Sequence, residues 1–358
     1  MRKLILHIGL HKTGTSAIQK HLITIEDELK VQGWSFFRIR KDGDISNVGN
    51  INTWIDFTGK GNDFLATVDD GLYSALEKTS GNIIASCEEL SWLTPEQVQN
   101  MESRLHEIFT DIKIICYVRR QDEHFISHYK QGFRYPHSSA RMFYSFSNPL
   151  TPLWQDYYHK YLDYFAKAEA WSSAFGVSNI IFKEFNREKL YAQNSALDFM
   201  KTLGLDIEEN IKSDKKNSVN EALSFQQCVV NDAVFETRSE LWYELGGQSF
   251  SKKLGFKGIP GEKNDFLHYF KVNLRKEFLQ SNIKLKSYIP SLSNDWVELS
   301  ESAGHTHQKA SLCTSELELY RESLVSLVSY IDDISLYQFL KFKLRKFRNK
   351  YISKIRKR

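Results

Sequence analysis

Short apolar runs alternate with amphipathic segments over roughly the first two hundred residues, and they predict the core of the protein. Four runs have the length and composition of buried strands, at 3–8, 81–90, 111–118 and 178–185. Helical patterns lie between them, one from Thr15 to about Lys30 and another over 93–109. Buried strands separated by helices are typical of a parallel sheet covered on both faces. We therefore predict an α/β fold with a central, mainly parallel sheet flanked by helices.

The second of these helices has a clear start signal. Thr94 stands at the N-cap position, Pro95 follows at the first helical position, and Gln97 completes a capping box. The helix thus starts only at Thr94, which argues against Glu88 and Glu89 being acids that merely support its dipole.

The alternation fades after about Asp206, and the rest of the chain is predicted to be helical. Residues 221–245 and 263–281 have helical patterns, separated by a Gly/Lys-rich loop at 246–263 that is a candidate mobile segment. We predict a core over 1–224, a helical elaboration packed on it over 225–333, and a tail over 334–358. Whether the loop acts as a lid is left open.

The excess of basic residues is concentrated in the tail. The formal net charge is +4, but residues 334–358 hold ten Lys or Arg and no acid, which leaves 38 basic and 44 acidic residues elsewhere. Apolar residues recur there every three or four positions, at Leu336, Leu340, Leu344, Phe347, Tyr351 and Ile355. Such a helix suits an anionic membrane surface, with packing on the body or nucleic-acid contact as alternatives. The acidic charge of the body argues against a broad nucleic-acid surface.

Cysteine spacing and hydropathy constrain the compartment. Cys87, Cys116, Cys228 and Cys313 form no C-x-x-C pair, so neither a disulfide framework nor a zinc site is indicated. The apolar run after Arg2 and Lys3 is too short for a secretion signal, and no segment is long and apolar enough to span a bilayer. We expect a cytoplasmic protein, peripheral on the inner face of the membrane if the tail binds there.

The loop after the first strand has the composition of an anion site. It contains Lys12, Gly14 and three hydroxyl side chains, which are Thr13, Thr15 and Ser16. Backbone N–H groups converge at a helix N-terminus, where the helix dipole also favours negative charge. In the nucleotide triphosphate loop, G-x-x-x-x-G-K-S/T, the lysine directly follows the second glycine, whereas Lys12 precedes Gly14 by two residues. The displaced lysine disfavours a kinase or ATPase.

This loop resembles the phosphosulfate-binding loop of sulfotransferases that use 3′-phosphoadenosine 5′-phosphosulfate (PAPS). The similarity is strongest to bacterial members with the pattern H-I-G-x-H-K-T-G-T-[TS]-x-x-Q, here residues 7–19. The resemblance implies a P-loop NTPase-like sulfotransferase fold and extends to about residue 224. It also implies that Arg119 and Ser127, eight residues apart after the strand 111–118, hold the 3′-phosphate of PAPS. Arg120 is a weaker candidate for that phosphate.

Sulfuryl transfer to an alcohol needs a base and a positive charge on the leaving oxygen. Lys12 supplies the charge. Glu88 and Glu89 follow the strand residues 83–87. Because two adjacent residues leaving a strand point in opposite directions, we favour Glu88 as the base with Glu89 in reserve. His11 is a rival, and His7 is predicted to be buried. No metal site is expected, because His305 and His307 have no further ligand nearby.

The acceptor is predicted only as a class. Aromatic residues crowd the region 125–165; we assign Trp154, Tyr157 and Tyr161 to the core, while 132–146 is either an acceptor loop or core. The leading hypothesis is a PAPS-dependent carbohydrate sulfotransferase acting on a hydroxyl of a carbohydrate or glycolipid. A P-loop-type nucleotide kinase or hydrolase and a non-catalytic nucleotide-binding protein are the alternatives.

Overall fold

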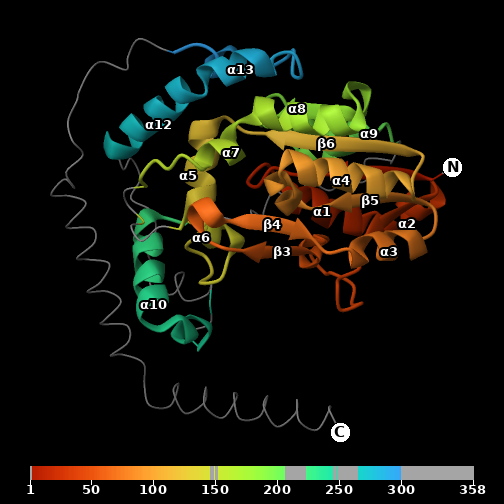
Figure 1. Cartoon of the computed structure of the whole chain (residues 1–358), viewed down its shortest axis with the longest axis horizontal. Coiled ribbons are helices and arrows are strands. Elements are labelled where there is room, and N and C mark those ends of the chain that lie inside the picture. The colour runs from red at the N-terminus through yellow and green to blue at the C-terminus, as the bar shows by residue number, and fades with distance from the viewer. Residues whose placement is uncertain are drawn as a thin grey trace, which may run out of the picture. The chain divides into compact units, whose positions relative to one another are not determined.

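The computed structural model describes residues 2–145, 149, 152–205, 223–244, 247 and 265–299 (Figure 1). The chain divides into two compact units. The first comprises 1–128, 154–219 and 267–305, and the second comprises 129–153, 220–266 and 306–358. The loop predicted at 246–263 lies outside the described residues apart from residue 247, and the basic tail lies wholly outside them.

A five-stranded sheet forms the centre of the first unit. Its strand order is β2-β5-β1-β6-β7, and every neighbouring pair is parallel. The strands are β1 (Lys3–His7), β2 (Trp34–Phe37), β5 (Asn82–Ser86), β6 (Asp111–Val118) and β7 (Ile180–Glu184). The predicted α/β fold with a central parallel sheet is confirmed. The sequence pattern missed β2, a four-residue edge strand whose first two residues are only partly buried.

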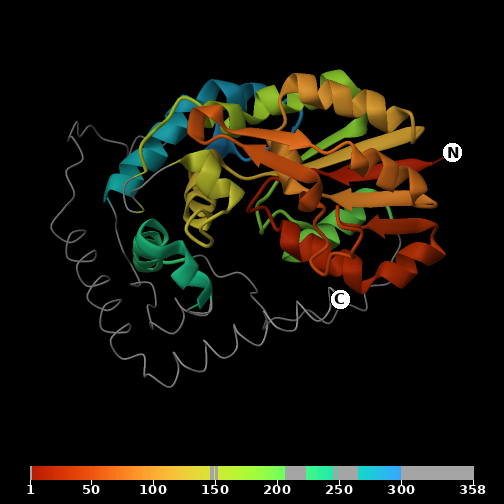
Figure 2. The ribbon, with the colours of Figure 1, turned by 60° about the horizontal axis from the view of Figure 1, so that its bottom comes forward.

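Helices cover both faces of this sheet (Figures 1 and 2). On one face, α1 (Thr15–Thr24) and α9 (Ser195–Leu203) pack together, and their apolar side chains join those of the strands in one core cluster. On the other face, α4 (Pro95–His106) packs against α8 (Tyr164–Phe175), which contacts β6 and β7. Burial on both faces explains why the strand sequences are apolar throughout.

The structure corrects the predicted bounds of one helix and one strand and confirms one helix start. The helix expected from Thr15 to Lys30 is two helices, α1 and α2 (Glu26–Val31), because the backbone leaves helical geometry at Ile25. The strand expected over 81–90 ends at Ser86, and the 3₁₀ helix η3 (Glu88–Trp92) follows it. The capping box at Thr94 is confirmed, with both reciprocal hydrogen bonds to Gln97 present.

The remaining elements of the first unit surround this sheet. An antiparallel pair, β3 (Ile55–Thr58) and β4 (Leu65–Val68), precedes α3 (Gly71–Lys78). Further helices are α5 (Gln121–Gln131), which runs on into the second unit, α7 (Tyr158–Leu162), α12 (Asp265–Glu277), which begins there, and α13 (Leu279–Leu285). Short 3₁₀ helices are η1 (Asn52–Trp54), η2 (Gly61–Asp63), η4 (Val177–Asn179), η5 (Tyr191–Gln193) and η6 (Asn294–Trp296).

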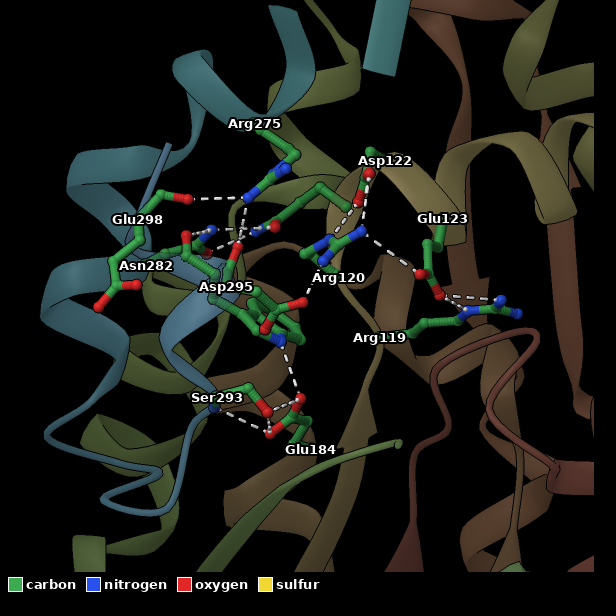
Figure 3. A network of polar contacts seen from close by, with 12 residues as sticks. Arg119, Arg120, Asp122, Glu123, Glu184, Arg275, Asn282, Ser293, Asp295 and Glu298 are labelled. Carbon is green, nitrogen blue, oxygen red and sulfur yellow. Dashed lines mark hydrogen bonds and ion pairs between the residues drawn. The ribbon is translucent and has the colours of Figure 1, made fainter. Parts of the chain in front are cut away.

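Polar contacts tie the segment after α13 to the end of β7 (Figure 3). Glu184 accepts hydrogen bonds from Ser293 Oγ at 2.6 Å and from Trp296 Nε1 at 3.0 Å. Asn282 of α13 exchanges hydrogen bonds with Gln121 at 2.7 and 3.1 Å. These bonds fix the start of α5, immediately after Arg119 and Arg120, relative to the sheet.

In the second unit, α6 (Ser139–Tyr144) and α10 (Phe225–Glu244) are joined by ion pairs. Arg141 pairs with Asp232 at 2.9 Å and with Glu236 at 2.7 Å. The segment 132–146, in which no helical period was recognised, contains α6, and its Phe133, Phe143 and Tyr144 are buried. Burial favours the core interpretation for these three aromatics.

Candidate anion-binding and acid–base site

The predicted site residues of the first unit meet at one edge of the sheet. The loop 8–14 follows β1, Glu88 and Glu89 follow β5, and Arg119 follows β6. The chain passes from β1 to β2 and β5 on one side, and then crosses to β6 and β7 on the other. Open parallel sheets bind ligands outside the carboxyl ends of the strands at such a switch in direction.

The loop brings its backbone close to other chain segments at two glycines. Gly14 has φ +84° and would place a Cβ 2.5 Å from Ser195 Oγ, and Gly9 has φ +93° and would place one 2.9 Å from Glu88 Cβ. Left-handed backbone and close approach both require glycine here. Thr13 is buried, and its hydroxyl donates to the Leu10 carbonyl at 2.6 Å, so this side chain serves the loop itself.

The N-terminus of α1 fits an anion. Within the described ranges, the backbone N–H groups of residues 13–16 donate no hydrogen bond, and α1 has neither a side-chain cap nor an acid in its first turn. Ser16 is exposed, and Lys12 is partly exposed. Unpaired donors, a helix dipole and one lysine together make a site for a phosphate or sulfate group.

Glu88 stands beside this loop in a network of donors. Its carboxylate accepts from Thr15 Oγ1 at 3.3 Å, Gln19 Nε2 at 3.0 Å and Asn50 Nδ2 at 2.9 Å. Burial raises the pKa of Glu88, and the hydrogen bonds from Gln19 and Thr15 and the charge of Lys12 oppose the rise. Glu88 remains partly exposed.

Glu89 has a different environment. Only 7% of its surface is exposed, and its carboxylate accepts from Asn50 Nδ2 at 3.3 Å and from the Cys87 thiol at 3.5 Å. Burial and the negative charge of Glu88 raise the pKa of Glu89. We expected the two side chains to point in opposite directions because adjacent residues of a strand do so. That reason is wrong, since both residues lie in the 3₁₀ helix η3. They nevertheless differ in exposure.

The side chain of His11, which belongs to the loop 8–14, is buried among aromatic rings. Its Nδ1 is 2.6 Å from the Tyr161 hydroxyl, and its ring stacks on His128 at 4.5 Å. Burial, and then the charges of Lys12 and Lys167, lower the pKa of His11 to about 3. A neutral imidazole of that pKa is a weak base, so this geometry favours a role in holding the loop. His7 is also buried and bonds to Ser86 Oγ at 2.9 Å.

The two arginines after β6 have separate partners (Figure 3). Arg119 pairs with Glu123 on α5 at 3.0 Å and is partly exposed. Arg120 pairs with Asp122 at 2.7 Å and also with Asp295. Arg120 therefore links α5 to η6, which leaves Arg119 as the better anion ligand. Ser127 is half-buried within α5.

Sequence reasoning missed the roles of Asn50 and Gln19. Gln19 ends the motif that begins at His7, so its place in the motif was visible but its contact with Glu88 was not. Asn50 carries no sequence signal, because only the folding of the segment between β2 and η1 brings it to Glu88.

Two absences concern the described residues only. No group of three or more His, Cys, Asp or Glu side chains there is arranged to hold a metal ion. None of the helices in those ranges has the length and apolar character needed to cross a bilayer.

Fold and site together define an α/β protein with a parallel sheet and an anion-binding loop beside a carboxylate pair. No protein-family model matches the chain. It is 31% identical over 118 residues to an uncharacterized protein of Archaeoglobus fulgidus, covering 33% of this chain and 29% of that protein. The alignment thus spans less than a third of that relative's length.

A solved structure of a sulfotransferase from Alicyclobacillus acidocaldarius is also similar. It has 15% sequence identity and a TM-score of 0.39, covering 83% of this chain and 100% of that one. A match at this level carries no argument about activity, so the functional assignment depends on the residues of this chain.

Proposed function

We propose that the protein transfers a sulfuryl group from PAPS to a hydroxyl of a carbohydrate or glycolipid. The observation that carries the proposal is the position of the loop next to the partly exposed carboxylate of Glu88. The loop contributes the Lys12 ammonium and the backbone N–H groups of residues 13–16, which donate no hydrogen bond within the described part of the chain. Such a site combines an anion cradle with a base. The acceptor class rests on the sequence resemblance alone.

PAPS supplies the sulfuryl group, and this chain's residues bind and orient it. The N–H groups at the start of α1 and the Lys12 ammonium suit the phosphosulfate, and Lys12 would neutralise charge on the leaving phosphate oxygen. Arg119, with Ser127, suits the 3′-phosphate, because guanidinium binds phosphate through two parallel hydrogen bonds. Glu123 then competes with the ligand for Arg119.

Glu88 is assigned as the general base that takes the proton of the acceptor hydroxyl. Its raised pKa makes the carboxylate a stronger base, while the donors Gln19 and Thr15 favour its ionised form. Asn50 also donates to it, at 2.9 Å. The buried Glu89 lacks this access.

Ligand-dependent melting tests the donor. Adenosine 3′,5′-bisphosphate without magnesium should stabilise the protein by about 2.7 kcal/mol at one hundred times its Kd, raising Tm by several degrees. Stabilisation only by ATP with magnesium would instead indicate a kinase or hydrolase. If neither ligand stabilises the protein, the proposal that it binds a nucleotide is refuted. Incorporation of label from [³⁵S]PAPS into a glycan or glycolipid fraction tests the transfer itself.

A further inference from the structure

One amide group contacts both carboxylates of the site. Asn50 Nδ2 donates to Glu88 Oε2 at 2.9 Å and to Glu89 Oε2 at 3.3 Å. Asn50 Oδ1 accepts from the backbone N–H of Asn52 at 2.8 Å, which fixes which end of the amide faces the carboxylates. Asn50 is 8% exposed, so these bonds are shielded from water.

The backbone on either side of Asn50 is held in place. Ile51 N donates to the Ser86 carbonyl at the end of β5, at 3.3 Å. Gly49 has φ +79° and lies so close to Phe36 and Gln19 that a Cβ would be 2.9 and 3.1 Å from their side chains. Asn50 is therefore preorganised by contacts to β2, β5 and α1.

The hydrogen bonds to the two carboxylates are unequal. Glu88 also accepts from Gln19 and Thr15 and interacts with the charge of Lys12, whereas Glu89 accepts a longer bond from the Cys87 thiol, at 3.5 Å. Two adjacent shielded carboxyl groups resist double ionisation. The better-solvated group with more donors keeps the charge, and the buried group keeps the proton.

Other titratable groups face this pair from several elements. Gln19 also donates to Ser86 Oγ at 3.1 Å, which bonds to His7, and burial lowers the pKa of His7 to about 3. Burial raises the pKa of the Cys87 thiol. The pKa of the Tyr161 hydroxyl is also raised, mainly by burial and to a smaller extent by the charge of Glu88. These three groups stay neutral near pH 7, whereas the charge of Lys12 acts on Glu88.

We propose that Asn50 is a positioning residue that holds the Glu88 carboxylate ionised and oriented for the acceptor, with Glu89 as its neutral neighbour. This inference rests on the proposed function. In the reaction, the acceptor proton moves to Glu88 as the acceptor oxygen bonds to sulfur. The bond from sulfur to the donor's phosphate oxygen breaks, and that oxygen keeps the electron pair.

The test compares Asn50→Asp, Asn50→Ala and Asn52→Ala. Alanine removes the donor, and aspartate matches the size of asparagine but replaces the donor by a third carboxylate, which also repels Glu88 and Glu89. We expect kcat to fall about tenfold in Asn50→Ala and further in Asn50→Asp; the pH profile, which a merely structural role would not shift, is the readout that separates the two roles. The acid limb of the kcat–pH profile should rise by about one pH unit in Asn50→Ala, because ionised Glu88 loses a donor. The exposed Asn52 is the matched control and should change nothing.

Affinity for adenosine 3′,5′-bisphosphate should stay within about threefold of wild type in the Asn50 variants, because Asn50 contacts the base and not the donor loop. An unshifted acid limb in Asn50→Ala, or loss of bisphosphate binding in both variants, overturns the proposal. Infrared difference spectra at pH 7 provide a readout without activity. The band of a protonated carboxyl should disappear in Glu89→Gln and persist in Glu88→Gln. Absence of transfer by the wild type would refute the proposed function, whereas the reverse pattern of bands would refute this inference.

Discussion

Gly14→Ala should destabilise the protein by more than its backbone conformation explains. Gly14 has φ +84°, and its Cβ would lie 2.5 Å from Ser195 Oγ and 2.8 Å from Ser195 Cβ. The hydroxyl can rotate away, but the Cβ moves only if the start of α9 moves. Since Asn194 caps this helix through bonds to the N–H groups of Ala196 and Leu197, that shift disturbs the cap.

The chain offers a matched control for the backbone cost. Gly204, the C-cap of α9, has φ +65°, and an added Cβ there would have nothing within 4 Å. Gly204→Ala should therefore cost only about 1 kcal/mol, the expense of a left-handed alanine. Gly14→Ala adds an overpacking cost of about 1–3 kcal/mol, for a total of about 2–4 kcal/mol.

Urea unfolding followed by tryptophan fluorescence measures these differences, with the m-value checked for constancy. Ser195→Gly in the Gly14→Ala background removes the side chain that the new methyl group meets, so it should recover about 1–2 kcal/mol in a double-mutant cycle. Equal losses in Gly14→Ala and Gly204→Ala, or no recovery by Ser195→Gly, would refute the close approach of the loop to α9.

The remaining predictions concern charge. Lys12→Ala should lower the transfer rate by about two to three powers of ten, and near-wild-type turnover would exclude Lys12 from the leaving oxygen. Arg119→Ala should raise KM for PAPS with little change in kcat, whereas Arg120→Ala should mainly lower the urea midpoint because its ion pairs are structural. The pKa of His7 falls from 6.5 to about 3 on folding, so below pH 6.5 the unfolded chain binds the extra proton. Relative to His7→Asn, the wild-type protein should thus lose unfolding free energy as the pH falls from 6.5 to 5, with a slope that approaches about 1.4 kcal/mol per pH unit. If the unfolding free energies of the two proteins change equally with pH, His7 is not buried in its neutral form.

The strands and the opening loop could be predicted from sequence because their signals are local. A continuous apolar run such as 111–118 indicates a buried strand whatever surrounds it, and the box at Thr94 and Gln97 is satisfied within one turn of helix. The loop composition at 12–16 likewise predicted an anion site before any partner was known. The break of the first helix at Ile25 was missed, because nothing in the local pattern marks it.

Only the tertiary structure decided how the charged side chains are used. Arg119 and Arg120 are neighbours with the same chemistry, but Arg120 is engaged by Asp295, 175 positions away, and Arg119 by Glu123, one helical turn along. His11 is neutral because Tyr161 and Trp92 enclose it. Glu88 differs from Glu89 because α1 brings the donors Thr15 and Gln19 to it and because it is more exposed. Ionisation depends on solvation and on charges within a few ångströms. Those surroundings are assembled by residues far apart in the chain, so no local pattern encodes them.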